Sequence, residues 1–87
     1  MNKKELVLLF LELFEPSDIV WAKEMKMAEK LLDNFCPEDL RYTLDYYKKS
    51  GYTLNSLAFF ITKKFDAIHK AISIREAEVK MKEGGGT

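Results

Sequence analysis

Residues 3–14 read KKELVLLFLELF, and this stretch indicates the fold class. Its apolar residues recur at i, i+3, i+4 and i+7, the spacing of one helical face, at Leu6, Leu9, Phe10 and Leu13. The remaining apolar residues widen that face until only a narrow polar edge is left. We therefore expect a helix that is central in a bundle or buried on two sides, one of them by a second chain. Pro16 ends it, because proline lacks an amide hydrogen and disfavours helical geometry before it.

A second helix is expected to start after a capping side chain at Ser17 or Asp18 and to run to about Asn34. Spacings of four, three, four and three residues define its core-facing stripe, formed by Trp21, Met25, Ala28, Leu32 and Phe35. The stripe predicts that Trp21 is a core anchor. The alternative for this residue is an aromatic hot spot at a partner interface.

A third helix is predicted to begin at Pro37, because proline suits the first helical position. Lys48 and Lys49 fall in its last turn, where positive charge complements the helix dipole. Gly51 follows as a left-handed cap.

A fourth helix is expected to start at Thr53 or Asn55 and to continue without interruption for about 25 residues. Its apolar stripe consists of Leu57, Phe60, Ile61, Ile68 and Ile72. The part beyond Arg75 has little to bury, so it should project or fray. Together the elements predict an all-α, four-helix bundle-like domain over residues 1–82, with most of the core on the first two helices, and a disordered tail over 83–87.

Composition narrows the function classes. Fourteen basic and fourteen acidic residues give zero net charge, so neither a strongly basic nucleic-acid binder nor an acidic mimic is indicated. The single cysteine, Cys36, excludes an internal disulfide, and no secretory signal or apolar run near the roughly twenty residues of a membrane span occurs. We therefore expect a cytoplasmic protein. The lone histidine, His69, has no ligand set around it, so we expect no metal, no cofactor and no enzymatic activity.

The segment Tyr46–Tyr52 combines aromatic residues, lysines and a glycine turn. Aromatic rings stack on exposed bases and lysines neutralise phosphates. This pattern predicts a nucleic-acid-binding surface that consists of Lys48, Lys49, Tyr52, Lys63, Lys64 and Lys70. The alternative is a plain helix C-terminus, with lysines answering the dipole and tyrosines packed partly inside.

Five pieces between Trp21 and Phe60 occur in an order that resembles a known helical module: Trp21–Glu24, Ala28–Leu32, Cys36–Leu40, Leu44–Lys49 and Leu54–Phe60. The module is that of phage and bacterial replication-initiation proteins, the replisome organisers and helicase-loading factors related to DnaD. The resemblance implies a role in assembling DNA, helicase or initiator complexes without turnover. The winged-helix domain of the larger proteins and the family's late tryptophan have no counterpart here, so docking on a replication or host protein is an alternative to direct DNA contact.

Three functions therefore stay open at this point. The first is a DNA-replication accessory module that binds DNA or a replication protein. The second is a small phage-type adaptor or inhibitor that binds a host protein through an apolar helix face, with Trp21, Leu8 and Leu11 as the interface. The third is a homodimerisation module.

Overall fold

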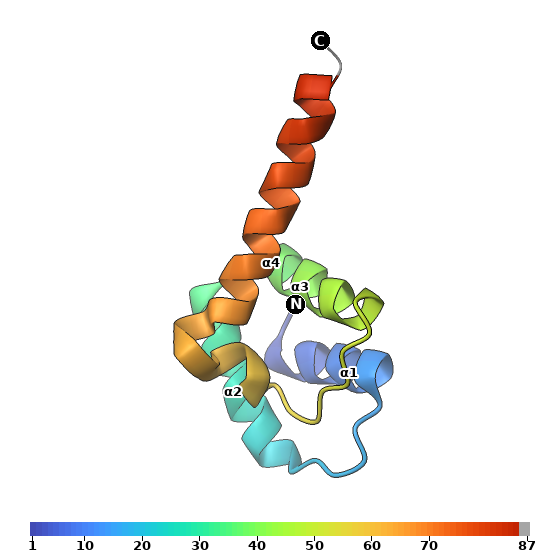
Figure 1. Ribbon diagram of the computed structural model, residues 1–87. Coiled ribbons are helices and arrows are strands. Elements are labelled where there is room, and N and C mark those ends of the chain that lie inside the picture. Colours follow the sequence, from blue (N-terminus) through green and yellow to red (C-terminus); the bar gives the residue numbers. More distant parts are fainter. Residues whose placement is uncertain (86–87) are drawn as a thin grey trace.

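The computed structural model describes residues 1–85, and in this range the chain forms four helices and no strand (Figure 1). The helices are α1 (Lys3–Phe14), α2 (Trp21–Asn34), α3 (Pro37–Lys49) and α4 (Ala58–Gly85). The first three helices and the beginning of α4 surround the core, whereas the rest of α4 projects from the domain and gives a length of 50 Å against a width of 24–26 Å. The predicted all-α fold with a long C-terminal helix is confirmed.

Helix α1 begins with a capping box. The Asn2 side chain accepts a hydrogen bond from the Glu5 amide at 2.9 Å, and the Glu5 carboxylate accepts one from the Asn2 amide at 3.2 Å. These reciprocal bonds satisfy two donors that a helix start leaves free. The helix ends at Phe14, and its C-cap Glu15, directly before Pro16, has a left-handed φ of 45°.

Helix α2 starts later than predicted. Its N-cap is Val20, which makes no side-chain capping bond, so the expected caps at Ser17 and Asp18 are wrong. The predicted stripe is also rotated, because the buried positions are Glu24, Ala28 and Leu31. Three members of the predicted stripe, Met25, Leu32 and Phe35, are only half-buried.

Glu24 turns inward because its carboxylate is needed at the start of α4. It accepts hydrogen bonds from the Ser56 hydroxyl at 2.6 Å and from the Leu57 amide at 2.9 Å. The Ser56 oxygen in turn accepts a bond from the Ala58 amide at 3.2 Å. Glu24 and Ser56 thus satisfy the N-terminal amides of α4, and the starts predicted at Thr53 or Asn55 are wrong.

Helix α3 begins and ends where predicted. Pro37 is its first residue, and Gly51 adopts a left-handed φ of 86° just beyond its end. The Gly51 amide donates to the Lys48 carbonyl and the Tyr52 amide to the Tyr47 carbonyl, both at 3.1 Å. This pair of bonds is a Schellman motif, which satisfies the last carbonyls of the helix.

Helix α4 is bent near its start, contrary to the prediction of an uninterrupted helix. Residues Lys63, Lys64 and Phe65 have φ of 55°, 54° and 65°, after an extended ψ of 150° at Thr62. A left-handed conformation costs an L-residue about 1–2 kcal/mol. The bend compensates for that cost by directing both parts of α4 against the core, since Phe60 before it and Ile68 after it are fully buried.

Beyond the bend, α4 passes the core and then extends away from it (Figure 1). Ala71 is buried, whereas residues 76–80 are exposed. The prediction that the segment beyond Arg75 projects is confirmed. The helix is described to Gly85, and the end of the tail predicted over 83–87 lies outside the described residues.

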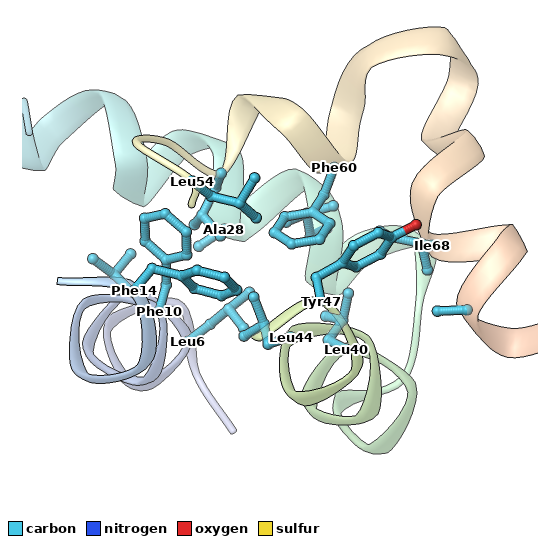
Figure 2. Close-up of a cluster of buried hydrophobic side chains, with 14 residues drawn as sticks. Leu6, Phe10, Phe14, Ala28, Leu40, Leu44, Tyr47, Leu54, Phe60 and Ile68 are labelled. Carbon is cyan, nitrogen blue, oxygen red and sulfur yellow. The ribbon is translucent and has the colours of Figure 1, made fainter. Parts of the chain in front are cut away.

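The core is shared among all four helices and the segment that joins α3 to α4 (Figure 2). Among the described residues, α1 and α2 supply six of its fourteen buried hydrophobic members, so the expectation that they carry most of it is wrong. Figure 2 shows Phe10 and Phe14 of α1 facing Leu54, and Tyr47 of α3 beside Phe60. Residues of α3 and α4, among them Tyr47 and Phe60, therefore share the core packing that the sequence predicts for α1 and α2.

Candidate nucleic-acid interface

A cleft of about 230 Å³ lies where the end of α3, the segment after it and the bend of α4 meet. Its lining consists of Tyr47, Tyr52, Phe59, Thr62, Lys63, Asp66, Ala67 and Lys70. Residues from both sides of the α4 bend take part, so the bend shapes one wall. The lining combines aromatic rings with two lysines and one carboxylate.

Tyr47 forms the centre of the aromatic floor. Its ring meets that of Tyr52 edge-on at 4.9 Å between centroids and that of Phe59 at 5.4 Å. Its hydroxyl donates a hydrogen bond to the Ala67 carbonyl at 2.9 Å, which joins α3 to the part of α4 beyond the bend. Burial raises the pKa of Tyr47 above its usual range. Tyr47 therefore connects the two sides of the cleft through its ring contacts and its hydroxyl hydrogen bond.

Tyr52 lies at the rim of the cleft. It is 45% exposed although its ring packs against both Tyr47 and Phe59. A tyrosine fixed on one side and open on the other has little rotational freedom left to lose on binding. Such a ring is a suitable platform for a planar ligand group.

The charge in the cleft comes from Lys63 and Lys70, against the single carboxylate of Asp66. Both lysines are exposed. Lys63 lies within the α4 bend and Lys70 follows the bend in the helix, and both line the cleft. The balance favours an anionic ligand modestly.

Of the six residues predicted for nucleic-acid binding, the cleft gathers Tyr52, Lys63 and Lys70. Lys49 instead pairs with Asp45 at 2.9 Å, and this hydrogen bond raises the pKa of Lys49. Lys48 and Lys64 are exposed but lie outside the lining. The aromatic floor residue Phe59 was not predicted; its signal was its place in the aromatic pair Phe59-Phe60.

An ion pair joins α4 to the start of α3, whereas the cleft lies at the end of α3. Arg75 donates a hydrogen bond to Asp39 near the start of α3, and its guanidinium lies 5.2 Å from the ring centroid of Tyr42. The Arg75 hydrogen bond holds the pKa of Asp39 below its usual range. The pair and the Tyr47 hydroxyl fix α4 against α3 at two separate points.

The residues predicted for a protein interface, Trp21, Leu8 and Leu11, differ in how far they are exposed. Trp21 opens α2 and is 40% exposed, so the prediction of a core anchor is wrong. The first buried residue of α2 is Glu24, about one turn after Trp21. Leu8 is 47% exposed, whereas Leu11 is half-buried against the core.

Two further findings concern the described part of the chain. It contains no cluster of three or more His, Cys, Asp or Glu side chains arranged to hold a metal ion. None of its helices is both long and apolar enough to cross a membrane.

Comparisons with protein-family models, with curated proteins and with solved structures give no match to this chain.

Proposed function

We propose that this chain is a non-enzymatic accessory module of DNA-replication initiation that binds single-stranded DNA in the α3–α4 cleft. The observation that carries the proposal is the placement of the half-exposed Tyr52 ring beside Lys63 and Lys70. A planar ring and two cations in one cleft match the two repeating groups of a single strand, the base and the phosphate.

A single strand fits this cleft better than a duplex. Bases in a duplex are stacked on each other and cannot reach a protein ring, whereas an unpaired base can lie on Tyr52. The cleft also presents no long basic helix for a major groove, because its lining includes two lysines, both from α4 and separated by the carboxylate of Asp66. We therefore expect binding to depend little on the base sequence and to weaken as the salt concentration rises.

The replication role rests on the resemblance between Trp21 and Phe60. Tyr47 and Phe59, which form the floor of the cleft, belong to two of the pieces that carry it. If the resembling pieces form one binding surface, side chains from different pieces should lie together in it. Tyr47 and Phe59 meet this condition, since both line the cleft. Assembly of a complex on DNA requires association only, which agrees with a cleft that combines stacking and charge.

The test is fluorescence anisotropy of a labelled thymidine oligonucleotide at two salt concentrations. The Tyr52→Ala variant should lose roughly 5- to 150-fold in affinity, because stacking of one base contributes about 1–3 kcal/mol. A double variant, Lys63→Ala with Lys70→Ala, should bind more weakly and lower the slope of log K against log salt by about 1.4. The matched control replaces Lys23 and Lys30 of α2, which are exposed lysines outside the cleft.

The control variant removes the same charge from the protein, so it separates the cleft from net charge. Equal losses in the control and the cleft variants would reject the cleft as the site. No binding by the parent at low salt would reject direct DNA contact. Thermal unfolding of each variant checks that Tyr52→Ala retains the fold despite the loss of packing on Tyr47.

A second candidate function is an adaptor that binds one host protein through an apolar face. The observation in its favour is that Trp21, at 40%, and Leu8, at 47%, are both exposed large hydrophobic side chains. Tryptophan is enriched among residues that dominate binding energy at interfaces. Such binding should respond to Trp21→Ala and change little with salt, the reverse of the pattern expected for the cleft.

A further inference from the structure

The bend in α4 combines two features that oppose each other. Three successive residues without glycine, Lys63 to Phe65, take the left-handed conformation that L-residues avoid. The sequence around them contains neither glycine nor proline from Tyr52 to Glu83, and its apolar residues keep helical spacing across the bend. The local sequence therefore favours a straight helix at the point where the fold bends the chain.

Straightening the helix within one chain would uncover the core. Ile68 and Ala71, which follow the bend, are both fully buried. The Tyr47 hydroxyl bond to Ala67 and the Arg75 bond to Asp39 would be broken as well. A straight α4 is consequently compatible with a covered core only if another chain supplies the same segment.

We propose that α4 is exchanged between two copies of this chain, with Thr62–Phe65 as the hinge. In the dimer, α4 is straight. Its part beyond the hinge packs on α3 of the partner copy and makes there the contacts that it makes with its own α3 in the monomer. Hinge segments under strain favour such exchange, because the dimer keeps the packing contacts on both sides of the hinge and releases the strain within it. The interaction surface is thus the α3 face that carries Asp39 and Tyr47, and its partner is a second copy of the chain.

The two copies keep their native contacts in either form, so the balance depends on the hinge. Glycine adopts the left-handed conformation freely and lowers helix propensity, whereas alanine does the reverse. Lys64 is the position for the test, since it is exposed and lies outside the cleft lining. Lys64→Gly should favour the bent monomer and Lys64→Ala the straight dimer.

The first experiment is sedimentation velocity over a wide concentration range, after refolding at high concentration. The parent should form a dimer. Lys64→Gly should raise the dissociation constant of that dimer at least about a hundredfold, because it shifts the hinge equilibrium of each of the two chains about tenfold or more toward the bent form. Lys64→Ala removes the same charge and should dimerise at least as well as the parent. A parent that stays monomeric, or a dimer equally strong in Lys64→Gly, would overturn the proposal.

A crosslinking experiment separates exchange from ordinary dimerisation. In a Cys36→Ser background, one chain carries Asp39→Cys and the other Arg75→Cys, and the two are refolded together and treated with a short bis-maleimide. Exchange predicts an intermolecular 39–75 link, located by mass spectrometry, well above the links that each variant gives alone. A dimer without that link would overturn the proposal. Neither result depends on DNA binding, so the proposed function and the exchange can fail separately.

Discussion

Replacing Glu24 by alanine removes the group that joins α2 to the start of α4. The carboxylate accepts two hydrogen bonds, from the Ser56 hydroxyl at 2.6 Å and from the Leu57 amide at 2.9 Å, and only 2% of the residue is exposed. After the substitution, water can reach the hydroxyl more readily than the buried amide. The amide is therefore the more costly loss.

The magnitude follows from these contacts. A buried donor left without a partner costs about 1–3 kcal/mol, and the negative charge near a helix N-terminus contributes about 0.3–1 kcal/mol. With the lost bond to the Ser56 hydroxyl, we expect the free energy of unfolding of Glu24→Ala to fall by about 3 kcal/mol. For a domain of this size the melting temperature should then fall by roughly 12–24 °C. Glu24→Gln keeps one acceptor oxygen and should lose about half as much.

The assay is urea unfolding followed by circular dichroism at 222 nm, which reports all four helices, whereas the exposed Trp21 is a poor reporter of the core. The control is Glu29→Ala, because Glu29 is exposed and its only described ion pair, with Lys3 at 3.3 Å, is at the surface. This control should change stability by less than about 1 kcal/mol. A loss below about 0.5 kcal/mol in Glu24→Ala would refute the capping role.

Three other predictions concern the ends and braces of α3. Because Arg75 lowers the pKa of Asp39, the pair stabilises the fold fully above the unfolded carboxyl pKa of about 3.9, and this stabilisation is lost as the pH falls through the lower folded pKa. Asp39→Ala should therefore flatten the acid limb of the pH–stability curve, and an unchanged limb would contradict the pairing. Gly51→Ala should cost about 1 kcal/mol by urea unfolding, since the added methyl meets no atom within 4 Å and only the φ of 86° opposes it; no loss would contradict the left-handed cap. Tyr47→Phe should cost about 1 kcal/mol in the same assay, because the Ala67 carbonyl loses its donor, and an equally stable variant would contradict that brace.

The helix boundaries that the sequence predicts well are those with a local chemical cause. Pro16 and Gly51 mark the ends of α1 and α3 because a ring or a missing side chain acts within one or two residues. The start of α2 has no such signal, since Val20 makes no capping bond. The start of α4 depends on Glu24, which lies more than thirty residues away in the chain. Such a partner is decided by tertiary packing and has no local pattern.

The candidate site shows the same division. Tyr52 and the lysines are visible in the sequence as an aromatic and basic segment, but which lysines meet Tyr52 depends on the bend after Phe59. The bend has no local cause in the sequence, because every residue in it is compatible with a helix. Lys63 therefore joins the cleft while Lys64, its neighbour, does not. Trp21 illustrates the opposite error, since helical spacing alone placed a residue in the core that the first turn of α2 leaves exposed.

The most direct test of the proposed cleft is an NMR titration of the ¹⁵N-labelled chain with an unlabelled thymidine oligonucleotide. We expect the backbone amide signals of Tyr52, Lys63 and Lys70 to shift together and to return when salt is raised, while those of α2 stay in place. Shifts that cluster around Trp21 and Leu8 instead, or no shifts at saturating oligonucleotide and low salt, would contradict the account.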